Sequence, residues 1–140
     1  MSATLASFVN HMLWHLAEAS RLVELDGEDS IDPDKPCGPW SPELCSAALL
    51  IWLDAGMVHC EAPIGFGPFP DSWKQRARVL NSFYIFDERD SRELIGDTSV
   101  WEHPGLGYYT QVSMSQQHQD TPDDVWISAI SGRVEHLLDS

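Results

Sequence analysis

Residues 41–61, SPELCSAALLIWLDAGMVHCE, decide the fold because they carry the clearest structural signal in the chain. Ser41 is a favoured N-cap residue, Pro42 and Glu43 suit the first helical turn, and Gly56 stands where a helix ends in a left-handed residue. The residues between these marks are apolar on almost every face, which is typical of a helix buried on most sides. The run MVHCE at 57–61 then favours a short strand. This predicts a central helix followed directly by a strand.

Composition indicates one globular domain over residues 1–140, with 43% hydrophobic residues and six Trp. Its acidic residues outnumber its basic residues by 22 to 8, which gives a net charge of -14. Such a surface repels nucleic acid and anionic membranes, and it attracts basic proteins. An acidic cytoplasmic protein with no charged partner fits the same numbers.

The three cysteines, Cys37, Cys45 and Cys60, are odd in number and lack CxxC spacing, which disfavours a disulfide framework. The first sixteen residues lack the basic region and cleavage site of a signal peptide, and no apolar run is long enough to span a bilayer. These features predict a cytoplasmic chain. We expect it to be a monomer or a weak dimer, which these features do not decide.

Residues 4–25 predict an amphipathic helix, with apolar residues at steps of three and four, that packs on the central helix. His11 and His15 lie one turn apart within HMLWH, but this motif lacks the glutamate of zinc proteases and no third ligand follows by spacing. We therefore expect solvated or stacked histidines, with no metal and no cofactor.

Residues 26–39, DGEDSIDPDKPCGP, predict an acidic loop. Its acids do not match the alternating positions, central glycine and closing glutamate of an EF-hand loop, which argues against calcium. The loop is either a plain solvated connector or a source of carboxylates for Arg and Lys on a partner. The carboxylates in question are Asp26, Glu28, Asp29, Asp32 and Asp34.

Two segments follow the predicted strand. Residues 62–70, APIGFGPFP, predict a loop whose Ile64, Phe66 and Phe69 either anchor a partner or fold back as a lid on the core.

Residues 72–80, SWKQRARVL, predict a short helix with three of the eight basic residues. In so acidic a chain these bases are expected to pair with its own acidic residues.

The second half of the chain gives weaker signals. Residues 82–86 suit a strand or an extended crossing, and the following DERDSREL, with Asp87, Glu88 and Asp90, predicts a surface loop or short helical turn. Residues 98–115 predict a hairpin with its turn at 104–107. After a polar loop at 116–124, residues 125–130 fit either a helix or a third strand, and we prefer the strand, followed by a terminal helix to Leu138.

The order of elements predicts a compact α+β domain with a small antiparallel sheet. At LIWLDAGMVHCE the chain resembles the helix-to-strand step of winged-helix domains over about twenty residues. DNA reading is not expected, because this region carries Glu43, Asp54, Glu61 and Glu102 in place of basic residues.

In overall character the chain resembles the immunity proteins of polymorphic, type VI and contact-dependent bacterial toxin systems, since it is small, acidic, rich in aromatics and without a catalytic motif. The resemblance implies a non-catalytic antitoxin that binds a cognate, basic toxin domain and covers or distorts its active site. Carboxylates at the rim of the interface would attract the basic toxin, and aromatic side chains would form its buried centre. The candidate contacts are Asp26, Glu28, Asp29, Asp32, Asp34, Phe66, Phe69, Asp87, Glu88, Asp90 and Trp101.

Two other functions remain open at this point. A DNA mimic of phage origin would place its carboxylates at phosphate-like spacing along one face. A small hydrolase would use His59 or His103 with a carboxylate, in a deep pocket beside Cys60.

Overall fold

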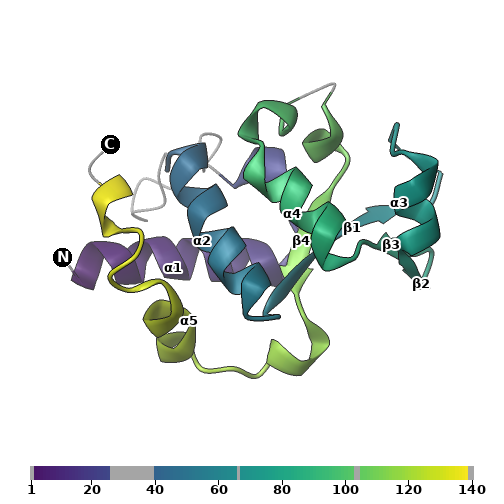
Figure 1. Cartoon of the computed structure of the whole chain (residues 1–140). Coiled ribbons are helices and arrows are strands. Elements are labelled where there is room, and N and C mark those ends of the chain that lie inside the picture. The colour runs from purple at the N-terminus through teal and green to yellow at the C-terminus, as the bar shows by residue number, and fades with distance from the viewer. Residues whose placement is uncertain (1, 26–39, 66, 103–104, 139–140) are drawn as a thin grey trace.

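A computed structural model describes residues 2–25, 40–65, 67–102 and 105–138, which form an α+β domain as predicted (Figure 1). In this described part the helices are α1 (Ser2–Ala17), α2 (Pro42–Asp54), α3 (Asp71–Arg76), α4 (Glu88–Gly96) and α5 (Asp123–Ile130). The strands are β1 (Val58–Pro63), β2 (Arg78–Leu80), β3 (Phe83–Ile85) and β4 (Gln111–Met114). None of the described helices is long and apolar enough to cross a membrane.

Helix α2 begins and ends as its sequence predicts. The Ser41 side chain accepts a hydrogen bond from the Leu44 amide at 3.1 Å, and Gly56 has a φ of 73° just after the helix. Trp52, in the last turn, is fully buried and donates its indole N–H to the Trp126 carbonyl of α5 at 3.1 Å. The central helix is therefore confirmed, and it also positions the C-terminal part of the chain.

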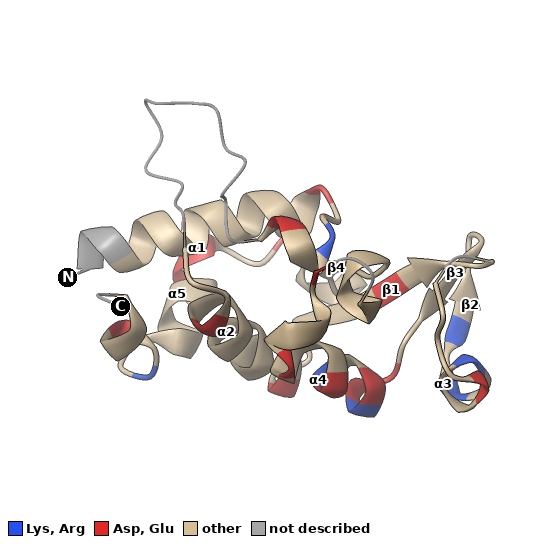
Figure 2. Cartoon of the chain, turned by 90° about the horizontal axis from the view of Figure 1, so that it is seen from above, with Lys and Arg blue, Asp and Glu red and all other residues tan. Residues whose placement is uncertain are grey.

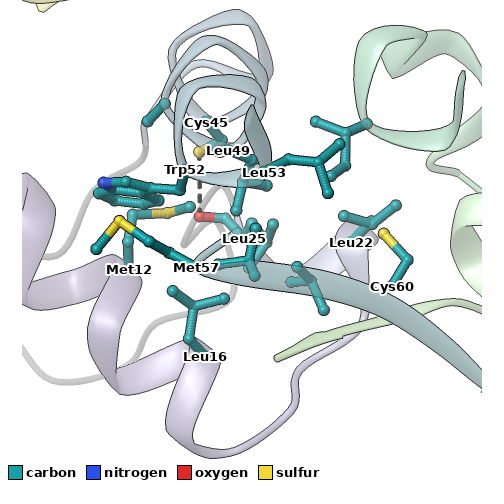
Figure 3. Packing of buried hydrophobic residues seen from close by; sticks show 14 of the residues in the cluster. Met12, Leu16, Leu22, Leu25, Cys45, Leu49, Trp52, Leu53, Met57 and Cys60 are labelled. Carbon is teal, nitrogen blue, oxygen red and sulfur yellow. Dashed lines mark hydrogen bonds between the residues drawn. The ribbon is translucent and has the colours of Figure 1, made fainter. Parts of the chain in front are cut away.

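Helices α1 and α2 both contribute side chains to a core that includes Met12, Leu16 and Trp52 (Figure 3). Leu25 lies between the two helices, and its carbonyl accepts from the Cys45 thiol at 3.6 Å. The N-terminal and central helices therefore share one core across Leu25, and the closest neighbours of α1 are α5 and β4 and not α2 as predicted.

Helix α1 is shorter than the predicted residues 4–25, because it ends at Ala17 and a 3-10 turn, η1 (Leu22–Glu24), follows. The segment between them pairs with β4 instead: the Val112 amide donates to the Ser20 carbonyl, and the Leu22 amide donates to Thr110, both at 3.0 Å. Backbone pairing with the sheet here replaces the hydrogen bonds that a longer helix would make.

The sheet has the order β2-β3-β1-β4, with antiparallel pairing throughout. Along β1, residues Val58, Cys60 and Ala62 face the core, and His59 and Glu61 lie on the outer face. Alternation along the strand therefore separates the neighbours Cys60 and His59 onto opposite faces.

The segment predicted as one helix over 72–80 is a helix followed by a strand. Helix α3 ends at Arg76, where Ala77 becomes extended, and β2 then pairs with β3 through a two-residue turn. Asn81 and Ser82 in this turn have φ values of 53° and 70°, as in a type I′ turn. The strand interpretation of 82–86 is confirmed, with β3 inside it.

The predicted hairpin over 98–115 is wrong, since only its second arm, β4, is a strand and its partner is β1. The first arm turns onto α4 because Trp101 is buried and donates its indole N–H to the Leu94 carbonyl at 2.9 Å. Gly107 packs against the Trp101 backbone so closely that an added Cβ would lie 2.5 Å from its Cα. These contacts produce two 3-10 turns, η2 (Thr98–Val100) and η3 (Leu106–Tyr108).

The strand preferred for residues 125–130 is also wrong, because this segment is helix α5. Trp126 and Ile130, four residues apart, point into the core from one helical face. In place of the predicted terminal helix, a single 3-10 turn, η5 (Glu135–Leu137), lies near the C-terminal end of the described part.

The charged segment after β3 is a nine-residue helix, α4, and therefore longer than the predicted loop or helical turn. Asp87 is its N-cap and accepts from the Asp90 amide at 3.0 Å. Leu94 and Ile95 are buried, and the Ile95 carbonyl accepts a hydrogen bond from Ser46 of α2 at 2.7 Å. Packing against α2 thus stabilises α4 as a helix, although its charged sequence predicts only a loop or a single turn.

Candidate functional site

Six of the predicted contact residues lie outside the part of the chain that the structure describes. They are Asp26, Glu28, Asp29, Asp32, Asp34 and Phe66. The other predicted contacts, Phe69, Asp87, Glu88, Asp90 and Trp101, can be placed.

Phe69 and Trp101 are buried and cannot serve as exposed aromatic anchors. The Phe69 ring lies 5.0 Å from Phe86 and 6.3 Å from Trp73, centroid to centroid, so its side chain folds back onto the core. Trp101 is held beneath α4 by its hydrogen bond to Leu94. Of the two interpretations of residues 62–70, that of a lid over the core therefore holds for Phe69.

Asp90 is also unavailable to a partner, since it is fully buried. The Arg76 guanidinium donates to both of its oxygens, at 2.7 and 3.0 Å, and lies 3.7 Å from Asp87. These carboxylates raise the pKa of Arg76 further, chiefly through the Asp90 hydrogen bond. The predicted intramolecular pairing of the basic segment is confirmed at Arg76.

Asp87 and Glu88 remain accessible on α4, but each already contacts an arginine. Glu88 accepts from Arg92 at 3.0 Å, and Arg92 also pairs with Asp54 of α2. The α4 surface therefore mixes both signs of charge (Figure 2). It is a poorer acidic patch than the sequence predicts.

A different acidic surface lies where α5 packs beside α1. A groove of about 330 Å³ runs between these helices and is lined by Ala6, Ser7, Val9, Asn10, Asp123 and Ile127. Asp120, Asp123 and Asp124 are exposed at this end of α5, and within the described residues none of them forms an ion pair. These three carboxylates thus leave local negative charge beside the groove.

Two large apolar side chains stand exposed on the same two helices. Trp14 is 59% exposed and continues the α1 stripe of Ala6 and Asn10 at steps of four, and Val125 of α5 is 44% exposed. We call the groove residues together with Trp14, Asp120 and Asp124 the α1/α5 surface. Val125 lies on the opposite side of α5 from the groove residues Asp123 and Ile127. In this described region an exposed tryptophan and carboxylates without an ion pair lie on, or just before, two helices that pack together.

This surface does not follow from the sequence, because the strand preferred for residues 125–130 leaves Asp123 and Asp124 in a polar loop. A signal was available, since Trp126 and Ile130 have helical spacing and the preceding TPDD is a good helix start. A helical assignment would have placed Asp123 and Asp124 together in the first turn of that helix, with Asp123 one turn before Trp126 and Ile127.

A second cleft, of about 380 Å³, lies on the outer face of the sheet and includes His59, Arg78 and Gln116 in its lining. His59 Nε2 lies 3.0 Å from the Ser113 hydroxyl and 3.4 Å from a Glu61 oxygen. Both contacts use the same ring nitrogen, whereas a catalytic triad needs its carboxylate on the other one. This geometry therefore does not activate Ser113 as a nucleophile.

Cys60 does not join this cleft, because its side chain faces the core. Burial, as the main cause, raises the pKa of the Cys60 thiol to about 12, so the reactive thiolate is absent near neutral pH. His59 and Cys60 therefore point to opposite faces of the sheet and do not share a pocket, and His103, the other histidine considered for a hydrolase, lies outside the described residues.

The two histidines of α1 serve the packing of the N-terminal segment. His11 Nε2 lies 2.7 Å from the Leu25 carbonyl, and His15 Nδ1 lies 2.8 Å from the Ser20 hydroxyl. The ring centroids are 4.6 Å apart in an edge-on arrangement, and both rings are buried, so the histidines are neither solvated nor stacked face to face. Among the described residues, no three His, Cys, Asp or Glu side chains gather to hold a metal ion.

Comparison of the chain with protein-family models, with curated proteins and with solved structures finds no match. Only the arrangement of residues within this chain therefore bears on its function.

Proposed function

We propose that this chain is a non-catalytic immunity protein that binds and neutralises a basic bacterial toxin domain through its α1/α5 surface. The observation that carries the proposal is the set of exposed carboxylates, Asp120, Asp123 and Asp124, unpaired within the described residues and beside a groove on the helix pair that also carries exposed Trp14.

The chemistry of this surface suits a protein partner. Trp14 offers exposed apolar area that can become the dry centre of an interface. The neighbouring carboxylates lie where Lys or Arg of a partner can pair with them. The net charge of -14 adds a long-range field that speeds the approach of a basic domain.

The acidic segment 26–39 stays in the proposal as a second source of carboxylates, as its sequence predicts. Asp87 and Glu88 are secondary, because their existing arginine contacts must be shared or broken when a partner binds.

The first test is protection. The chain is co-expressed in the native host with the product of the neighbouring gene, and growth is followed. The proposal expects that product to arrest growth when expressed alone and to be harmless with this chain. A toxic neighbour that is not neutralised contradicts the proposal.

The surface is then tested by charge reversal in the purified complex. Asp123→Lys with Asp124→Lys should slow association at least about tenfold at low salt, because it removes local attraction. The matched control is Glu93→Lys with Glu102→Lys, two exposed carboxylates on and after α4 that change the net charge equally. If both pairs slow association alike, only the overall charge acts and the α1/α5 surface is not the interface.

The same complex separates the rival functions. A DNA mimic predicts that duplex DNA competes with the chain for its partner, whereas an immunity protein does not require this. A hydrolase predicts that His59→Asn abolishes protection while binding is retained.

A further inference from the structure

The two outer edges of the sheet differ. At β4 the Ser20–Leu22 backbone occupies the edge, through hydrogen bonds of 3.0 Å at both Val112 and Leu22. At the opposite edge, β2 has a described partner on one side only, which is β3. Unpaired edges of this kind add strands from other chains.

The pairing pattern shows which backbone groups of β2 face outward. The Phe86 amide donates to Cys60 of β1, so by alternation Tyr84 also faces β1, and Phe83 and Ile85 face β2. Their partners Leu80 and Arg78 therefore point their N–H and C=O groups inward. The N–H and C=O of Val79, between them, point away from the sheet.

Apolar side chains gather at the same edge. Val79 is 59% exposed and Leu80 is 47% exposed. Ile64, 42% exposed, adjoins them because its amide donates to the Ser82 carbonyl in the β2–β3 turn. These are three of the five large hydrophobic side chains that are exposed in the described part of the chain.

Charge decides which partner fits. Residues 62–86 contain three basic residues and one acidic residue, in a chain whose net charge is -14. In Figures 1 and 2 this segment, with α3 and β2, forms one end of the molecule, and the carboxylates lie mostly over the rest. This is therefore the end at which two copies can meet with their carboxylates held apart.

We propose that β2 pairs with β2 of a second copy across a twofold axis at Val79. Each Val79 donates its N–H to the other Val79 carbonyl, and the two sheets join into one antiparallel sheet. Arg78 then lies opposite Leu80 of the second copy, so the two guanidinium groups are not directly opposed. Val79 and Leu80 are each covered by a strand of the other copy, on opposite faces of the joined sheet, and Ile64 stays beside the β2–β3 turn. This interface does not depend on the proposed function.

Sedimentation of the full chain over about 10 µM to 1 mM tests the pairing. We expect a monomer–dimer equilibrium that strengthens as salt is raised, because each copy carries a charge of -14 and the two repel. Val79→Lys should weaken association at least about tenfold, since it places two ammonium groups side by side. The matched control is Val125→Lys, the same change at a similarly exposed valine outside the edge.

The amide exchange rate of Val79 gives a second measurement. The exchange rate should fall as the concentration of wild-type protein rises, and the rate at position 79 should stay constant in Val79→Lys. A thermal midpoint equal to that of wild type shows that the variant is folded. A wild-type chain that stays monomeric to about 1 mM overturns the proposal. So does a dimer that weakens with salt, or one that Val125→Lys disrupts as strongly as Val79→Lys.

Discussion

Ser82 has a backbone conformation that residues with a side chain rarely adopt. Its φ of 70° follows the φ of 53° at Asn81, and together they close the β2–β3 turn. Asn tolerates the left-handed region, whereas Ser is strained there because its Cβ crowds the backbone. The second position of such turns usually holds glycine.

Ser82→Gly should therefore stabilise the protein by roughly 0.5–1 kcal/mol, since it relieves the strain at a positive φ. Urea unfolding measures the change. The same substitution at exposed Ser128 in α5 is the control, and it should destabilise the helix by a similar amount. Equal effects at the two positions would contradict the role given to the Ser82 backbone.

At the scale of elements, a part-buried ion pair attaches α3 to α4. Arg76 at the end of α3 reaches Asp90 in the first turn of α4, and Asp90 is fully enclosed. Removal of the arginine would leave a buried carboxylate without a cation, which is more costly than loss of the whole pair.

Arg76→Met should lower the denaturant midpoint markedly, and adding Asp90→Leu to it should recover part of the loss. A double-mutant cycle by chemical denaturation measures the coupling. Arg92→Met is the control, because it removes the exposed pairs with Asp54 and Glu88 and should have little effect. If Arg76→Met costs no more than Arg92→Met, the part-buried pair does not hold α3 to α4.

The elements differ in how far sequence predicts them. Helix α2 is predictable because its cap, its proline and its terminating glycine are local signals at 41–56. The path of residues 98–110 is not, since it follows from the Trp101 hydrogen bond to Leu94 and the contact of Gly107 with Trp101. The alternating pattern of these residues predicts a strand, and it contains no sign that the Trp101 side chain packs beneath α4.

The chemical character of the candidate site could be predicted from the sequence, but its location could not. Net charge and aromatic content indicate an acidic surface with exposed aromatics, and the α1/α5 surface has both features. Its location depends on the helical state of 123–130 and on Arg76 enclosing Asp90, fourteen residues away. A single sequence does not contain the contacts that decide which carboxylates stay accessible.

For the whole molecule, the excess of carboxylates sets how stability responds to salt. Like charges repel in the compact state more than in the expanded unfolded chain. An increase from about 20 mM to about 500 mM NaCl shortens the screening length from roughly 20 Å to roughly 4 Å. Figure 2 shows acidic residues distributed over most elements, so this repulsion is not confined to one patch.

We therefore expect the thermal midpoint of the monomer to rise by a few degrees over that salt range, roughly in line with a gain of about 1 kcal/mol. Differential scanning calorimetry of dilute protein measures it. The Glu93→Lys, Glu102→Lys variant, with a smaller net charge, should show a smaller rise. A midpoint that falls with salt would mean that ion pairs such as Arg76–Asp90 outweigh the general repulsion.

The Ser20–Leu22 backbone on the β4 edge also sets a limit on growth. A sheet with two open edges can add chains without end and lengthen into a fibre. Here one edge is already occupied by the chain's own N-terminal segment, so pairing at β2 uses the single remaining site. If two copies pair at β2 as proposed, the Ser20–Leu22 backbone on the other edge limits the assembly to two molecules and prevents a polymer.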